Sequence, residues 1–116
     1  MGGDAFRYRP LSISVEHGRE EVTVVVVGEL DLATADELGH AVAQVLAAAV
    51  ADIALDLRGV DFIDSTGLRM LLSLRNDAKR NGHALTLLSP APTVQRIFAL
   101  TGTRGLFDCR VDHPRP

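Results

Sequence analysis

The sequence contains one cysteine, Cys109, among its 116 residues, so no disulfide can form within the chain. A chain without disulfides fits a reducing compartment. No metal-ligand spacing surrounds Cys109, and we expect its thiol to fill apolar space near the C-terminus. The four histidines are also far apart in the sequence, so we predict no metal site and no bound cofactor.

Long apolar runs are missing as well. A membrane-spanning helix needs roughly 20 consecutive apolar residues, and no segment approaches this length. Residues 42–50 form the longest candidate, and Gln44 interrupts them. The first ten residues lack the apolar core of a signal peptide. We therefore expect a cytoplasmic protein that does not insert into a membrane.

The sequence has no strongly basic segment either. Its formal net charge is −3, and no run of basic residues exceeds Lys79-Arg80. Nucleic-acid binding usually requires a basic face, so we exclude DNA and RNA as the main partner. The chain does have 47% apolar residues, which is enough to form the core of one small domain.

Alternating apolar and polar residues predict several short strands. Residues 11–16 alternate with the period of a strand, and the valine-rich run 22–27 predicts a second strand that ends at Gly28. The turn at 17–20 joins these two strands into an antiparallel hairpin. Further strands are predicted at three segments, which are 53–57, 84–88 and, as a short last strand, 106–111.

Three helices are predicted between and after these strands. Thr34 and Glu37 have the spacing of a capping box, which predicts a helix from there to about residue 50. A short loop at 58–63 leads to a second helix, which begins at Asp64-Ser65 and ends near Arg80. The third helix starts at Pro92, a residue favoured in the first turn, and Gly102 ends it.

This order of elements predicts a single small α/β domain over residues 11–111. Strands that alternate with helices favour a largely parallel sheet, and the opening hairpin adds an antiparallel strand. We therefore expect a mixed, mostly parallel sheet of four to five strands with three to four helices. Residues 1–10 are predicted to be a flexible lead-in and residues 112–116 a flexible tail.

The chemically informative segment is 56–68, which leads from a strand into a helix. Ser65 falls at the N-terminus of that helix, where backbone N–H groups and the helix dipole favour negative charge. A phosphate on Ser65 would add about −1.5 to −2 charges, which this position tolerates. Helix capping is the simpler explanation, because serine and aspartate commonly begin helices.

Two short motifs identify a wider similarity. Gly28-Glu29-Leu30-Asp31 follows the second strand, and Asp64-Ser65-Thr66-Gly67 begins the second helix. Together with the order of elements over residues 11–111, these motifs resemble the STAS domain, specifically the bacterial anti-sigma factor antagonists. The resemblance implies a STAS-like fold and a role in transcription regulation, including stress responses.

The resemblance also implies how such a protein works. The unphosphorylated antagonist binds an anti-sigma factor that is also a serine/threonine kinase, and the sigma factor is released. The kinase then phosphorylates the antagonist at the residue matching Ser65, with Thr66 as the weaker alternative, and binding stops. A serine phosphatase is a further possible partner. The expected partner-binding residues are Asp31, Thr34, Asp64, Ser65, Thr66, Gly67 and Arg69. Of these, Gly67 is expected to allow a partner to approach closely.

Two other readings stay open. The chain could be a STAS subunit without a switch, belonging to a larger assembly such as a lipid or anion transport complex. It could also be an enzyme with Ser65 as nucleophile, but neither a G-x-S-x-G motif nor a phosphate-binding loop is present. We therefore expect no catalytic residues. Asp56 and Asp61 are expected to be a strand-end residue and a turn former rather than metal ligands.

Overall fold

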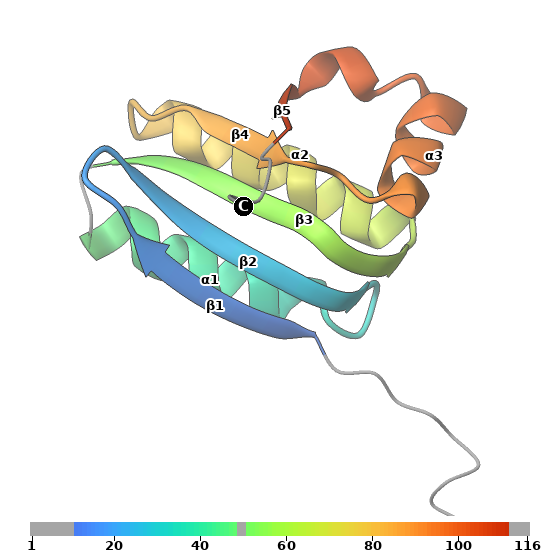
Figure 1. Cartoon of the computed structure of the whole chain (residues 1–116), viewed down its shortest axis with the longest axis horizontal. Helices are drawn as coiled ribbons and strands as arrows, with labels where there is room; N and C mark the ends of the chain where they lie inside the picture. The colour runs from blue at the N-terminus through green and yellow to red at the C-terminus, as the bar shows by residue number, and fades with distance from the viewer. Residues whose placement is uncertain (1–10, 49–50, 112–116) are drawn as a thin grey trace, which may run out of the picture.

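The computed structural model describes residues 11–48 and 51–111. Five strands form one sheet in the order of the chain, β1 to β5 (Figure 1). The strands are β1 (Ser12–His17), β2 (Glu21–Leu30), β3 (Asp52–Ile63), β4 (Leu85–Leu88) and β5 (Asp108–Arg110). The helices are α1 (Ala35–Ala48), α2 (Ser65–Arg80) and α3 (Pro92–Thr101), followed by a short 3₁₀ turn, Arg104–Leu106. In the described part of the chain, no helix is both long enough and apolar enough to cross a membrane.

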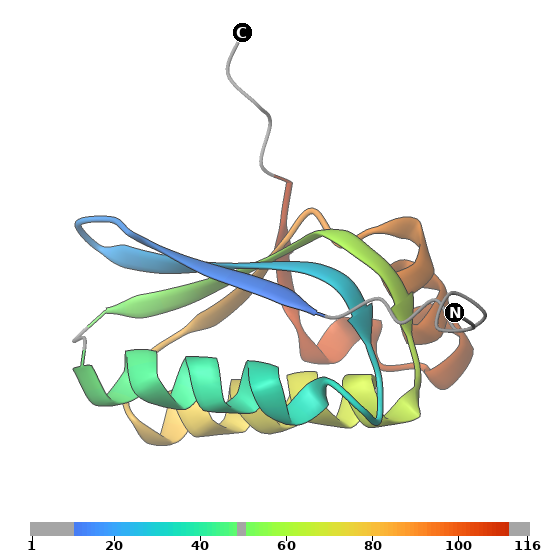
Figure 2. The same ribbon diagram turned by 90° about the horizontal axis from the view of Figure 1, so that it is seen from below.

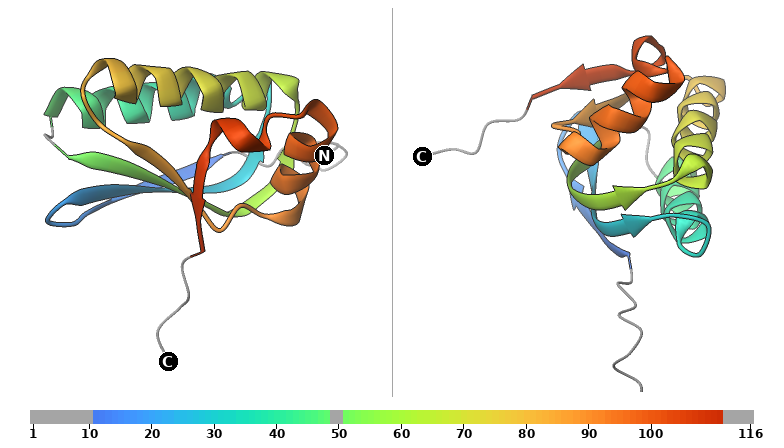
Figure 3. Two further views of the ribbon diagram at one scale, coloured as in Figure 1. Left: turned by 90° about the horizontal axis from the view of Figure 1, so that it is seen from above. Right: turned by 90° about the vertical axis from the view of Figure 1, so that its right-hand side faces the viewer.

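The sheet is mixed, because β1 pairs with β2 antiparallel while all later neighbours pair parallel. Helices α1 and α2 lie side by side against one face of the sheet (Figure 2). Helix α3 lies beside β3, past the end of the short strand β4 (Figure 3). The Ala91 N–H donates to the Leu57 carbonyl oxygen at 3.3 Å and joins the start of α3 to β3. These observations confirm the predicted fold class.

The core lies between the sheet and the helices. Alternate valines of β2 point into it, as the two-residue period of a strand requires, and they pack with apolar residues of α1 and α2. Phe98 of α3 stacks on Phe107 with ring centroids 4.9 Å apart, which closes the C-terminal end of the core. Cys109 is half-buried and packs against the core, and burial raises the pKa of its thiol.

The predicted helix ends agree closely with the structure. Helix α2 begins at Ser65 and ends at Arg80, and Gly82 follows with φ +77°. Pro92 occupies the first turn of α3, and Gly102 ends that helix in a left-handed conformation. The expected end of α1 near residue 50, the lead-in at 1–10 and the tail at 112–116 lie outside the described residues.

Two strand predictions were wrong in the same way. Strand β2 does not end at Gly28 but continues to Leu30, and the predicted loop at 58–63 is the second half of β3. Both extensions exist because the two strands go on pairing through register shifts, and Gly28 takes φ +114° within one of them. Val60 and Ile63 are buried, so this half of β3 also belongs to the core.

Asp56 is not a strand-end residue but lies in the middle of β3, where it is 8% exposed. Its carboxylate accepts from Arg58 Nη2 at 2.9 Å and from the Arg58 N–H at 3.1 Å. Burial raises the pKa of Asp56, but these hydrogen bonds and the charge of Arg58 outweigh burial and leave the pKa below its ordinary value of 3.8. Asp61, which was expected in a turn, is an exposed residue of β3.

We predict that Asp56→Asn lowers the free energy of unfolding at pH 7 by about 1 kcal/mol, because a charge-assisted hydrogen bond is lost. The folded-state pKa of Asp56 is depressed, so its contribution is complete above the ordinary value of 3.8 and disappears as the pH falls through the folded-state pKa. Urea unfolding of both proteins between pH 7 and pH 3 measures this. A difference that stays constant over the whole range would contradict it.

Candidate functional site

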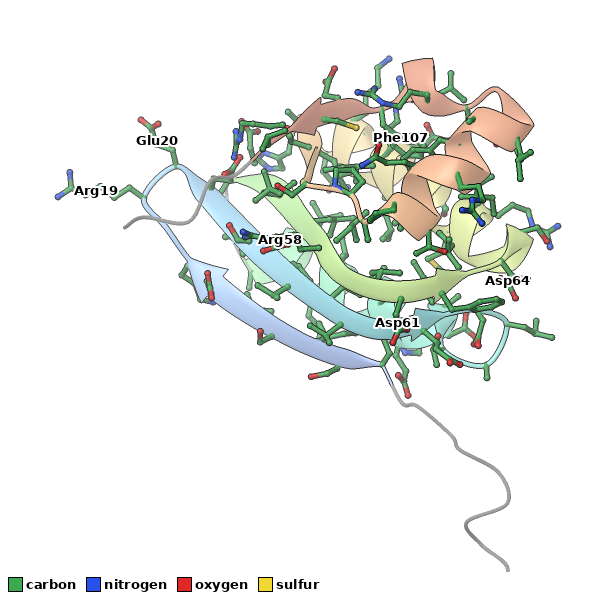
Figure 4. All side chains as sticks on the ribbon, turned by 45° about the vertical axis from the view of Figure 1, so that its right-hand side comes forward. Arg19, Glu20, Arg58, Asp61, Asp64 and Phe107 are labelled. Atoms are coloured by element: carbon green, nitrogen blue, oxygen red, sulfur yellow. The ribbon has the colours of Figure 1, made fainter. Side chains whose placement is uncertain are left out.

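The candidate site lies where β2 and β3 end together. Leu30 and Ile63, the last residues of the two strands, are paired neighbours in the parallel ladder. The chain after Leu30 forms a loop to α1, and the chain after Ile63 turns at Asp64 into α2. Figure 4 shows Asp64 at the turn from β3 into α2. Parallel pairing therefore brings the two sequence motifs together, although 32 residues separate Leu32 from Asp64.

Ser65 is the first residue of α2, and its side chain is exposed, whereas the side chain of Thr66 is half-buried. Within the described residues, the hydroxyl of Ser65 makes no hydrogen bond, and the N–H groups of Ser65 and Thr66 have no acceptor. The residue that caps α2 is Asp64, whose Oδ1 accepts from the Gly67 N–H at 2.9 Å. Capping therefore explains the presence of Asp64 but not that of Ser65.

The second carboxylate oxygen of Asp64 makes a contact far along the chain. Asp64 Oδ2 accepts from the Leu32 N–H at 3.2 Å, in the loop after β2. The Asp64 N–H in turn lies 3.4 Å from the Leu30 carbonyl oxygen. Asp64 therefore joins the loop that contains Asp31 to the helix that begins with Ser65.

The loop after β2 is held by its own polar side chains. Asp31 Oδ1 accepts from the Ala33 N–H at 2.9 Å. The Thr34 hydroxyl accepts from the Asp31 N–H at 3.0 Å and donates to the Glu29 carbonyl oxygen at 2.6 Å. These contacts fix the loop before α1 begins.

The predicted capping box of α1 was wrong. The Glu37 N–H donates to the backbone carbonyl of Thr34 rather than to its side chain, which is already used within the loop. Thr34 is only 1% exposed, and contact of its side chain with a partner stays a prediction. Its side chain stabilises the loop from inside.

Gly67 has a role within the chain. It is buried in the first turn of α2, and a Cβ atom added to it would lie 2.3 Å from the Leu30 carbonyl oxygen. The expectation that Gly67 lets a partner approach stays a prediction, and the structure gives the residue a further role within the chain. Its missing side chain lets the end of β2 approach α2, and any other residue would push the two apart.

Several exposed side chains surround Ser65 in sequence or in space. Arg69 lies one helical turn after Ser65 and is exposed. Sequence reasoning missed two apolar residues, Leu32 and Phe62, which are 80% and 46% exposed. Leu32 stands in a loop otherwise made of small or polar residues, and that contrast was the available signal. Leu32 and Phe62 give the site exposed apolar surface in addition to its carboxylates.

The carboxylates near the site are engaged in other contacts. Asp31 and Asp64 accept from backbone N–H groups, and Asp56 is paired with Arg58 on another part of β3. Across residues 11–48 and 51–111, no group of three or more histidine, cysteine or carboxylate side chains could hold a metal ion. Among the described residues, the arrangement instead presents the exposed hydroxyl of Ser65 beside carboxylates that are already hydrogen-bonded.

Comparison with known proteins agrees with this geometry. The family described as "Mlab, STAS domain" matches residues 13–108. The chain belongs to the STAS-domain family. This STAS domain is 31% identical over 83 residues to the anti-sigma-B factor antagonist of Staphylococcus aureus, and the match covers 72% of the chain and 77% of that relative.

Solved structures share the fold of this STAS domain. An anti-sigma factor antagonist from Mycobacterium paratuberculosis is 27% identical with a TM-score of 0.76, covering 85% of this chain and 84% of that one. The Bacillus cell fate determinant SpoIIAA in its phosphorylated form is 23% identical with a TM-score of 0.68, covering 88% of this chain and 92% of that one.

We predict that Gly67→Ala destabilises this STAS domain by about 1–3 kcal/mol, because its Cβ would collide with backbone that cannot easily move. Gly105→Ala is the matched control, since a Cβ at that position meets nothing within 4 Å. Thermal or urea unfolding of both variants measures the effect. Equal stability of the two variants would show that the end of β2 can move away from α2 without cost.

Proposed function

We propose that this STAS domain is an anti-sigma factor antagonist of the cytoplasm that is switched by phosphorylation of Ser65. Its unphosphorylated form binds an anti-sigma factor with serine kinase activity, and that factor then releases its sigma factor. The observation that carries the proposal is the exposed Ser65 hydroxyl, which has no structural task within the described residues. The antagonist named among its relatives supports the same function.

The folded domain can accept the phosphate because of where Ser65 lies. The first turn of α2 contains no acidic residue. The N–H groups of Ser65 and Thr66 belong to this turn, at the positive end of the helix dipole. A phosphate on Ser65 can accept hydrogen bonds from such groups. Phosphorylation should therefore leave the fold intact and change only the surface.

The same phosphate explains how binding would stop. It adds about two negative charges next to Asp64, whose carboxylate accepts from the backbone N–H of the exposed residue Leu32. A partner packed on this surface would have to desolvate that charge without an opposite charge placed to receive it. A penalty of about 1.4 kcal/mol weakens binding tenfold, so a few kcal/mol is enough to release the partner.

The proposal assigns the chemistry to the partner. The kinase transfers the γ-phosphoryl group of ATP to Ser65 Oγ, ADP leaves, and the hydroxyl proton passes to a base of the kinase. A serine phosphatase would hydrolyse the phosphoserine with water and restore the binding form. The chain itself acts as the phosphate acceptor and as a binding partner, not as an enzyme.

We predict that Ser65→Ala takes up no phosphate yet still binds the kinase, whereas Ser65→Asp folds normally and binds at least tenfold more weakly. Thr66→Ala and Ser73→Ala keep phosphate uptake, and Ser73 is the matched control because it is an exposed serine of the same helix. Intact-mass spectrometry after incubation with ATP and the kinase captured from the native cells measures uptake, and calorimetry measures binding.

Two results would contradict this function. The first is a wild-type chain that gains no phosphate from any kinase of its own cells. The second is phosphate uptake by Ser65→Ala that Thr66→Ala abolishes, which would move the acceptor to Thr66. Isolation of the wild type with a membrane complex instead of a kinase would favour the STAS subunit of a larger assembly.

A further inference from the structure

The two carboxylate oxygens of Asp64 serve two different segments. Oδ1 accepts from the N–H of the buried residue Gly67, and Oδ2 accepts from the N–H of the exposed residue Leu32. The first contact caps α2, which any good capping residue could do. The second contact is a tertiary one, because Leu32 belongs to the loop after β2. Helix capping alone does not explain why one side chain makes both contacts.

The loop around Leu32 has few other contacts to α2. Across the described part of the chain, its other hydrogen bonds join residues 29–37, from the end of β2 to the start of α1, and none of these reaches α2. The Leu32 side chain is 80% exposed, so burial does not hold it in place. Within the described residues, Asp64 Oδ2 is the only side-chain acceptor from α2 or its cap that reaches this loop.

We propose that Asp64 is a positioning residue that clamps the loop after β2 against the start of α2. Leu32 and Ser65 then reach the partner kinase as one rigid surface. This inference rests on the proposed function and assigns parts within it: Leu32 is an apolar anchor for the kinase, and Asp64 holds that anchor at a fixed place beside the acceptor hydroxyl. Preorganisation of this kind raises affinity because less freedom is lost on binding.

The substitution Asp64→Asn separates the two contacts of this side chain, the clamp on the Leu32 N–H and the cap on the Gly67 N–H. An asparagine carries one oxygen, so it can accept from only one of the two N–H groups and presents an NH₂ donor to the other. The asparagine oxygen should still accept from the N–H of the buried residue Gly67, because water can accept from the N–H of the exposed residue Leu32 instead. The variant therefore keeps a capped α2 and loses the clamp. Asp64→Ser, another good capping residue with a single short oxygen, should behave in the same way.

Amide hydrogen exchange in the isolated chain tests the clamp directly. In Asp64→Asn and Asp64→Ser we expect the Leu32 amide to exchange about tenfold faster than in the wild type, the change that loss of one charge-assisted hydrogen bond predicts. The Gly67 amide should keep its protection, which shows that α2 is still capped. Unchanged exchange at Leu32 in both variants would overturn the clamp.

Phosphorylation kinetics test its consequence for recognition. With the anti-sigma factor kinase that phosphorylates the wild type, Asp64→Asn should raise the KM for the chain about tenfold and change kcat by less than about twofold. Leu32→Ala should raise the KM similarly. The control is Leu100→Ala, which removes a leucine that is 79% exposed on α3 and should leave the KM unchanged.

A double-mutant cycle decides whether Asp64 acts through Leu32. In the Leu32→Ala background, Asp64→Asn should add less than about twofold to the KM, because the anchor that it positions is already gone. Additive effects would overturn the proposed coupling. If no kinase phosphorylates the wild type, the proposed function fails, and amide exchange at Leu32 still decides whether the clamp exists. If the wild type is phosphorylated and Asp64→Asn is equally good, the inference fails and the function stands.

Discussion

The site depends on the parallel pairing that carries β2 and β3 to a common end. Leu30 and Ile63 are the last pair of this ladder, so the two chain segments that follow them leave the sheet as neighbours. The missing side chain of Gly67 then allows the Leu30 carbonyl to approach the first turn of α2. Without the continued pairing through the shifted register, the two motifs would lie on separate loops. Asp64 could not reach Leu32 in that case.

The polar groups of the site differ in how much of their bonding capacity is already used. Asp31, Thr34 and Asp64 accept from backbone N–H groups of the same chain, so they contribute to the local structure of the site. The hydroxyls of Ser65 and Thr66 join no such contact in the described residues, and of these two residues only Ser65 is exposed. This separation suits a switch. A group can be attached to Ser65 without breaking a bond that holds the domain together, while the change in charge falls on the exposed surface.

Much of the fold could be predicted from the sequence because its signals are local. The ends of α2 and α3 follow from Asp64, Pro92 and the glycines that end helices, and each acts within one turn. The ends of β2 and β3 could not be predicted in this way. Gly28 reads as a stop in a single strand, and only pairing with β3 shows that it is an irregular position inside a longer one. Register shifts are properties of two strands at once.

The site shows the same division between local and tertiary signals. The position of Ser65 at a helix start could be predicted from the residues around it. The function of Thr34 could not, because its hydroxyl has two competing uses. As a helix cap it would satisfy one N–H of α1, but within the loop it accepts from Asp31 and donates to Glu29 while buried. A buried hydroxyl that leaves its donor or its acceptor unused costs desolvation free energy. The two loop contacts of Thr34 avoid that cost because they use both. The loop contact therefore prevails. It fixes the shape of the loop itself, whereas the place of Leu32 relative to α2 depends on its separate contact with Asp64.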